Sequence, residues 1–285
     1  MERAILRNLQ ADIQIELLND GWEKNNRNVW IKPEQSNKES ISWPVDSYEE
    51  NSYKENFWSK ARADLIIKTF NDLKIEALLE VGSGHGNVSI PLMKAGLEVI
   101  ALEPILGGAE QTAEWGLMTI HGSLHSIEKL ELAFSAIGIF DVLEHIKNPI
   151  AFITNMREKL NTGGIIVLTV PAHNWLFSDF DNAIGHYKRY TKNILRNEMR
   201  EAGFQEISSR YFFVTLVFPA FLFRRLPYIF GRKRSYSGEG GIKQHVKKTT
   251  NVNQLFDAFL YRILKIESQL RFPIGLSLLG VYQKI

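Results

Sequence analysis

Short apolar runs alternate with helical patterns through the middle of the chain. The apolar runs are rich in β-branched residues and predict strands at 77–81, 99–102, 118–120, 137–140 and 165–170. The stretches between them predict helices at 88–95, 109–115 and 149–160. Such alternation favours right-handed βαβ units and a parallel sheet. The last of these runs is apolar at almost every position, which suits a strand that helices cover on both faces.

The two ends of the chain depart from this alternation. Residues 21–53 are polar and rich in asparagine, so we expect an irregular arm that leads into a lid helix at 56–73. After the core the pattern predicts a helix at 191–202, a strand at 204–211, an aromatic stretch at 211–230, a basic loop at 232–250, a helix at 252–270 and a last strand at 277–282. We therefore expect an arm and lid (1–56), an α/β core (57–213), an insertion (214–272) and a last strand (273–285).

Composition excludes several kinds of site. Of the 285 residues, 45% are hydrophobic, which is enough for a sizeable core. The chain has 34 basic and 32 acidic residues, and a net charge of +2 is too small for a surface that binds nucleic acid throughout. Because there is no cysteine, disulfides, thiolate nucleophiles and cysteine-ligated metals are excluded. We expect no nucleic-acid partner.

Neither a secretory signal nor a membrane span is predicted. Residues 1–21 contain charged side chains throughout and lack the uncharged core of a signal peptide. The longest uncharged apolar run lies between Arg210 and Arg224, contains Pro219 and is shorter than the roughly 18 to 20 residues that a spanning helix needs. We expect a cytoplasmic protein.

A glycine-rich loop follows the first predicted strand of the core. It runs from Glu80 to Asn87 as E-V-G-S-G-H-G-N, and its glycines allow a tight turn and close approach of a ligand. Glu103 ends the next strand, about twenty residues on, where a carboxylate can accept both hydroxyls of a ribose. A dinucleotide fingerprint would have a third glycine at position 87, so Asn87 argues against a dinucleotide. The pattern predicts a ligand that carries a ribose.

These motifs resemble those of the class I S-adenosylmethionine-dependent methyltransferases. Residues 140–146 (F-D-V-L-E-H-I) with Asn148-Pro149, and residues 160–164 (L-N-T-G-G), resemble the ubiquinone-type (type 11) branch of that family. The likeness covers roughly 57–204 and, more weakly, 273–284. It implies a doubly wound, Rossmann-like α/β fold with a seven-stranded sheet, an N-terminal lid and an insertion before the last strand.

The resemblance also implies S-adenosylmethionine as cofactor and a set of residues that bind it. That set is Glu80, Gly82, Ser83, Gly84, Gly86, Glu103, Pro104, Ser123, Leu124, Asp141, Val142 and His145. Many relatives have an aspartate after the third strand to hold the adenine, whereas this chain has Ser123. For His145 a purely structural role stays open.

An acceptor site is expected beyond the fifth strand, where residues 173–190 contain histidines, aspartates and aromatic residues. His186 is the candidate base and His173 the alternate, because an imidazole is partly unprotonated near neutrality. Asp181, Arg189 and Tyr190 are the candidates for acceptor binding. A structural, hydrogen-bonded role is the alternative for either histidine. No metal is expected, because His85, His121 and His125 fall in different loops without metal-ligand spacing.

The insertion bears on the acceptor. Its phenylalanines around 212–223 are followed by arginines and lysines at 224–234, which suits a lipid-linked substrate and peripheral contact with the inner face of a membrane, although a helix core is the simpler reading. We expect O-methylation of a small-molecule, isoprenoid or lipid-linked glycan acceptor. Carbon or nitrogen methylation, and a non-catalytic nucleoside-binding module, are the alternatives.

Overall fold

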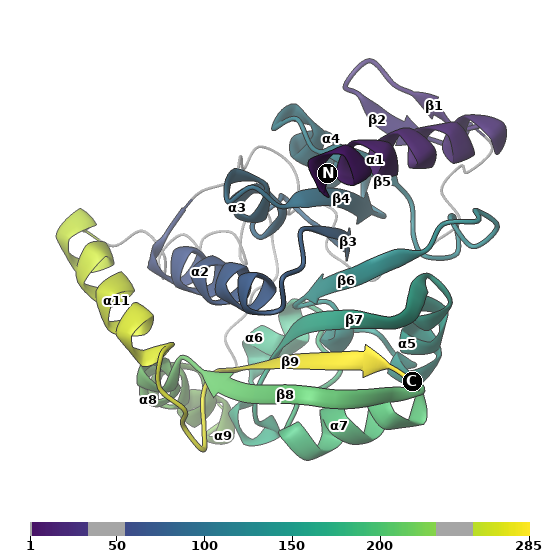
Figure 1. The fold of residues 1–285 in the computed structure, drawn as a ribbon. Helices are drawn as coiled ribbons and strands as arrows, with labels where there is room; N and C mark the ends of the chain where they lie inside the picture. The colour runs from purple at the N-terminus through teal and green to yellow at the C-terminus, as the bar shows by residue number, and fades with distance from the viewer. Residues whose placement is uncertain (1, 34–54, 232–252) are drawn as a thin grey trace.

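The computed structural model describes residues 2–33, 55–231 and 253–285, which form an α/β fold around one twisted sheet (Figure 1). The basic loop expected at 232–250 lies outside the described residues. In spatial order the strands are β1 (Glu23–Lys24), β2 (Val29–Ile31), β5 (Met118–His121), β4 (Glu98–Glu103), β3 (Ala77–Val81), β6 (Phe134–Phe140), β7 (Leu160–Pro171), β9 (Ser277–Lys284) and β8 (Phe204–Phe212).

In this order the strands from β2 to β7 run parallel to one another, whereas β1 is antiparallel to β2 and β9 is antiparallel to both β7 and β8. The seven strands from β5 to β8 are the predicted sheet, and β1 and β2 extend it at one edge. The carboxyl ends of the parallel strands share one rim, where an open α/β sheet binds its ligands.

Helices cover both faces of the sheet, as a doubly wound fold requires. They are α1 (Glu2–Asn19), α2 (Phe57–Asp72), α3 (Ser89–Lys94), α4 (Leu106–Glu114), α5 (Pro149–Glu158), α6 (Asp179–Ala183), α7 (Lys192–Glu201), α8 (Val217–Ala220), α9 (Leu226–Ile229) and α11 (Gln254–Glu267). A π-helical turn, Phe221–Arg225, joins α8 to α9.

Alternate residues of one strand reach different cores. Leu79 of β3 belongs to the core that includes residues of α1, α5 and α7, and Leu78 belongs to the core shared with α2, α3 and α11. Both leucines are fully buried. The apolar strands are therefore buried on both faces, as the sequence pattern predicts.

Local signals set several helix boundaries. The Asn56 side chain accepts hydrogen bonds from the backbone amides of Trp58 and Ser59, and Ser59 Oγ accepts one from the Asn56 amide. This capping box starts the predicted lid helix, α2. Pro149 occupies the first turn of α5, where its missing amide proton costs nothing.

The structure corrects two expectations. Residues 23–31 are not an irregular arm: β1 and β2 pair with each other, and β2 pairs with β5. Trp22 and Trp30 are buried beneath α1, and strands of two and three residues are too short to show alternation. The helix predicted at 149–160 ends earlier, at Glu158, and residues 161–164 belong to the irregular start of β7.

Among the described residues, none of the helices is long and apolar enough to cross a membrane.

Candidate active site

The loop after β3 has a backbone that glycine alone suits. Gly82 has φ +77°, and a Cβ there would lie 2.7 Å from Cγ2 of Val142. Gly86 has φ +79°, and its Cβ would lie 2.6 Å from Cδ1 of Ile90. Both positions are left-handed and crowded, so any side chain would strain the backbone and displace its neighbours. The loop therefore keeps its backbone exposed to a ligand at the rim.

Glu103 connects this loop to the next strand. Its Oε2 accepts a hydrogen bond of 2.7 Å from the Gly84 amide, and its Oε1 accepts one of 2.9 Å from the Ile105 amide. Burial raises the pKa of Glu103 to about 7, although these two amides counteract the shift. Each carboxylate oxygen has a second lone pair, so the group can still accept two hydroxyls of a ribose.

Two residues at the rim have unusual backbone angles. Asp141 (φ +58°) directly follows the last residue of β6. His173 (φ +61°) follows Ala172, which comes after the end of β7 and pairs with Tyr190 in an isolated β-bridge. Left-handed angles at non-glycine residues are strained and are concentrated at functional sites. Asp141 forms an ion pair with Arg62 of α2, and Thr169 Oγ1 donates a hydrogen bond of 3.0 Å to it.

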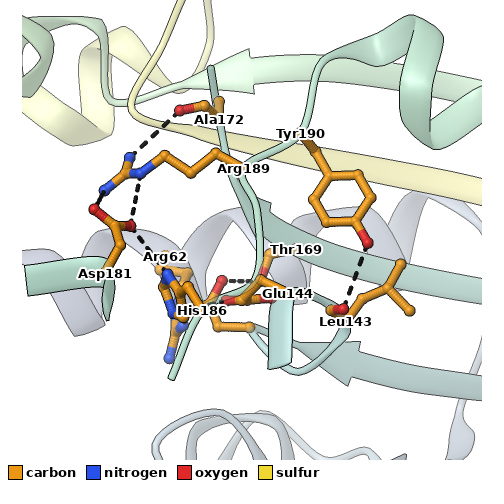
Figure 2. Close-up of polar contacts among 10 residues, drawn as sticks. Arg62, Leu143, Glu144, Thr169, Ala172, Asp181, His186, Arg189 and Tyr190 are labelled. Carbon is orange, nitrogen blue, oxygen red and sulfur yellow. Dashed lines mark hydrogen bonds and ion pairs between the residues drawn. The ribbon is translucent and has the colours of Figure 1, made fainter. Parts of the chain in front are cut away.

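A buried charge network surrounds His186, as Figure 2 shows. His186 Nδ1 lies 3.0 Å from Asp181 Oδ1, and Arg189 donates to both oxygens of Asp181, from Nε at 2.7 Å and from Nη2 at 3.1 Å. Ser178 donates to Oδ2 from its amide and its hydroxyl. Burial alone would raise the pKa of Asp181, but the hydrogen bond from His186 and the Arg189 charge lower it to about 2.

This network fixes which nitrogen of His186 carries the proton. An ionised Asp181 can only accept, so Nδ1 bears the hydrogen and Nε2 keeps its lone pair. Burial lowers the pKa of His186, and the hydrogen bond to Asp181 partly offsets that shift. His186 is therefore neutral at pH 7, with a basic nitrogen turned away from Asp181.

Glu144 lies on the Nε2 side of His186 (Figure 2). Its Oε1 is 3.6 Å from Nε2, which is too long for a hydrogen bond. The residue is 1% exposed, and neither carboxylate oxygen has a hydrogen-bond partner among the described residues. Burial raises the pKa of Glu144 to about 8, so the carboxyl group is mostly neutral at pH 7. A buried carboxyl without a partner next to a basic imidazole is a feature of active sites.

Comparisons with known proteins show the family to which the chain belongs. Residues 51–209 match the family model described as a methyltransferase domain. The chain belongs to that methyltransferase family. It is 27% identical over 113 residues to the ubiquinone biosynthesis O-methyltransferase of Bradyrhizobium sp. (strain ORS 278), covering 38% of this chain and 45% of that protein. The Cereibacter sphaeroides (strain ATCC 17029) protein of the same name is 31% identical over 103 residues, which cover 34% and 42%.

The matched segment thus spans less than half the length of these relatives. Among solved structures, an S-adenosylmethionine-dependent methyltransferase from Thermotoga maritima aligns with a TM-score of 0.50 at 15% identity, covering 85% of this chain and 91% of that one. A methyltransferase structure from Galdieria sulphuraria gives 0.50 at 13%, covering 84% and 95%. These likenesses confirm the predicted Rossmann-like fold, and the family confirms S-adenosylmethionine as the cofactor.

The residues of the methyltransferase loop fit this cofactor. The Ser83 hydroxyl is buried and has no hydrogen-bond partner among the described residues, and Glu103 retains its free lone pairs. Glu80 is buried deeper, accepts from Ser89 Oγ at 2.5 Å, and has its pKa raised by burial to about 8. Ser123 Oγ accepts from the His125 amide, so its expected adenine contact, like that of Leu124, stays a prediction.

The predicted acceptor residues of the methyltransferase separate into two groups. His186 and His145 meet edge to face with ring centroids 4.6 Å apart, and burial lowers the pKa of His145 to about 3. His173 instead packs between Trp175 and Tyr211, with centroids 5.8 Å and 4.6 Å away. The geometry therefore favours His186 over His173 as the base.

Asp181, Arg189 and Tyr190 are at most 5% exposed and bind protein groups; Tyr190, for example, donates to the Leu143 carbonyl at 3.4 Å. These side chains offer little exposed surface to an acceptor. Asp181 contacts His186 directly, and Arg189 contacts Asp181. Their predicted role in acceptor binding stays a prediction. Glu144 was not predicted as a site residue. It lies in the quoted 140–146 motif, but its burial and its distance from His186 depend on the loop at 178–190.

Glu144, His145 and His186 could also chelate a metal ion, since their ligand atoms lie within 4.8 Å of one another. The charges of Arg62 and Arg189 act on Glu144 in the same cluster and would repel a cation. The expectation that the methyltransferase binds no metal here stays a prediction.

Proposed function

We propose that the protein transfers a methyl group from S-adenosylmethionine to a hydroxyl group of a small-molecule, isoprenoid or lipid-linked glycan acceptor. The observation that carries the proposal is the neutral His186 imidazole, held by Asp181 with Nε2 free. The name of the matched relatives, ubiquinone biosynthesis O-methyltransferase, supports oxygen as the methylated atom. In this proposal the protein is cytoplasmic, and a lipid-linked acceptor would bring it to the inner face of a membrane.

The cofactor, when bound, supplies a methyl group on a positively charged sulfur. The chain supplies its binding site: Glu103 accepts the ribose hydroxyls, and the 82–86 loop presents backbone amides and the Ser83 hydroxyl. Alignment of the acceptor oxygen with the methyl carbon provides much of the rate, because displacement at that carbon needs a defined line of approach.

His186 takes the proton that the acceptor hydroxyl loses. Nε2 is the basic nitrogen, and the imidazolium formed by proton transfer is stabilised by the ionised Asp181 at Nδ1. Arg189 keeps Asp181 ionised and in place, so Asp181 and Arg189 act by positioning His186. General-base catalysis of this kind contributes typically about 100- to 10,000-fold.

The protonation state of Glu144 affects whether His186 can accept this proton. An ionised carboxylate 3.6 Å from Nε2 would attract a proton to His186 before the acceptor arrives and would raise its pKa. Because burial keeps Glu144 protonated at pH 7, the imidazole stays unprotonated. The carboxyl group then offers a hydrogen-bonding partner for the incoming hydroxyl.

The test is His186→Ala, with His125→Ala as a control in an exposed histidine. Release of S-adenosylhomocysteine is measured with a panel of phenolic, isoprenoid and lipid-linked sugar acceptors, while calorimetry follows S-adenosylmethionine binding. We expect turnover to fall about 100- to 10,000-fold in His186→Ala, with cofactor affinity within about threefold of the parent.

Unchanged turnover of a hydroxyl acceptor would remove His186 as the base. Turnover only with amine acceptors, unaffected by the substitution, would favour N-methylation, because an unprotonated amine needs no base. Cofactor binding without turnover of any acceptor would favour a nucleoside-binding module.

A further inference from the structure

Helix α11 has both buried and exposed apolar side chains. Leu260 and Leu264 pack into the core shared with α2. Phe256, Phe259 and Ile266, in contrast, are 50%, 57% and 65% exposed. Their spacings of three and seven residues place them on one stripe of the helix. The helix therefore presents an apolar stripe that no described part of the chain covers.

A second exposed apolar segment starts where α11 ends. Glu267, at the end of α11, accepts hydrogen bonds from the Val214 amide and from both the amide and the hydroxyl of Thr215, just before α8. Figure 1 shows the lower end of α11 reaching α8. From α8 to the residue that follows α9, the exposed apolar side chains are Phe218 (70%), Leu222 (37%), Phe223 (59%), Ile229 (54%) and Phe230 (73%).

These two segments hold an unusual share of the exposed apolar side chains. Among the described residues, 20 large hydrophobic side chains are exposed, and ten of them lie between 218 and 270. Exposed apolar groups that are scattered need no explanation, whereas a concentration on neighbouring helices marks an interaction site. We call these ten residues the insertion face: Phe218, Leu222, Phe223, Ile229, Phe230, Leu255, Phe256, Phe259, Ile266 and Leu270.

The charges on and beside the insertion face are mainly positive. The described cations there are Arg224, Arg225, Arg262, Lys265 and Arg271, and the described carboxylates of α11 are Asp257 and Glu267. Two copies of this chain meeting at the face would bring like charges together, whereas an anionic bilayer attracts the cations and receives the apolar side chains.

We propose that the insertion face docks on an anionic lipid bilayer. The Phe and Ile side chains enter the headgroup and acyl boundary, and the arginine and lysine side chains contact lipid phosphates. The proposal deepens the proposed function, because the same segment contacts the acceptor region: Arg225 Nη1 donates to the Phe177 carbonyl at 2.7 Å, and the Trp175 and Phe221 rings are 6.0 Å apart. Docking brings that region to the membrane, where a lipid-linked acceptor is found.

Co-sedimentation of the full chain with vesicles tests the proposal. The two vesicle types are phosphatidylcholine alone and phosphatidylcholine mixed with phosphatidylglycerol. The test variant changes Phe218, Phe259 and Ile266 to serine, three exposed positions without a role in the cofactor loop or the His186 network. The parent should bind the anionic vesicles, and the variant should bind them at least about tenfold more weakly, because three apolar side chains no longer enter the bilayer.

The control variant changes Ile15, Leu18 and Ile207 to serine, which are 55%, 60% and 47% exposed on α1 and β8. It should bind vesicles like the parent. Equal sedimentation of the parent and the test variant would overturn the proposal, as would equal binding of the parent to neutral vesicles. A parent dimer that the test variant abolishes would instead make the face a contact between copies. S-adenosylmethionine binding should be the same in the parent and in both variants. A parent that does not bind S-adenosylmethionine would contradict the proposed function, and a variant that loses this binding would be misfolded; neither result would bear on docking.

Discussion

Replacing Asp181 with asparagine tests whether one buried charge organises the site around His186. Asp181 is fully buried, and its pKa falls from 3.8 to about 2 because the His186 hydrogen bond and the Arg189 charge outweigh the effect of burial. Because one unit of pKa corresponds to about 1.36 kcal/mol, this lowering of the pKa of Asp181 contributes about 2 kcal/mol to the free energy of unfolding.

The sign of the pH dependence follows from the lowered pKa. A group whose pKa is lower in the folded state stabilises the fold above its unfolded pKa of 3.8, and the contribution is lost as the pH falls through 2. Asparagine cannot ionise and leaves Arg189, which is 5% exposed, without its counter-charge. Breaking a buried pair in this way costs about 3 to 5 kcal/mol, so we expect a loss of about 2 to 5 kcal/mol at pH 7.

Urea unfolding followed by tryptophan fluorescence measures this difference at pH 7, 5 and 4. Asp179→Asn, two residues away on α6, is the matched control and should stay within about 0.5 kcal/mol of the parent. The difference between the parent and Asp181→Asn should not shrink from pH 7 to pH 5, because Asp181 stays ionised over this range and also raises the pKa of His186. A difference below about 1 kcal/mol, or one that already shrinks between pH 7 and 5, would refute the lowered pKa and the network built on it.

Three further substitutions probe the cofactor loop and the carboxyl group beside His186. Glu103→Ala should weaken S-adenosylmethionine binding by about 1.5 to 3 kcal/mol in calorimetry, and an unchanged affinity would remove the ribose contact. Gly82→Ala places a Cβ 2.7 Å from Val142 and should lose cofactor binding, whereas Gly96→Ala, also at positive φ but with open space around it, should lose only stability in thermal melts. Burial raises the pKa of Glu144 from 4.5 to about 8, so its contribution to stability is present below 4.5 and lost as the pH rises through 8. Glu144→Gln should therefore gain melting temperature relative to the parent between pH 6 and pH 9, and an equal response of the two proteins would contradict the raised pKa.

The α/β core was predictable because its signals are local. The continuous apolar runs at 77–81 and 165–170 fall within β3 and β7, and the glycine-rich loop sits directly after β3. The structure explains why glycine is needed at position 82: the backbone angle and the nearby Val142 both require the absence of a side chain. Such constraints act within a few residues or between neighbouring strands, where pattern and spacing are informative.

The N-terminal strands were missed for the opposite reason. β1 and β2 have two and three residues, too few to show a period of two, and β2 is a strand only because β5 pairs with it. Val29 and Trp30 are buried by residues of α1, α4 and the sheet, contacts that no local pattern encodes.

Glu144 shows most clearly what a motif leaves out. The 140–146 stretch gives its place after β6, but its unusual state comes from two other segments: α2 contributes Arg62, and the 178–190 loop contributes His186 and Arg189. Backbone contacts hold that loop against the motif, since the Tyr187 amide donates to the Glu144 carbonyl at 2.9 Å and the His173 amide to the Tyr190 carbonyl at 2.8 Å. Because the loop is held from both β6 and β7, the position of His186 relative to the cofactor rim is set by the sheet. A substitution that loosens the loop without touching His186 should therefore lower turnover while leaving the cofactor site intact.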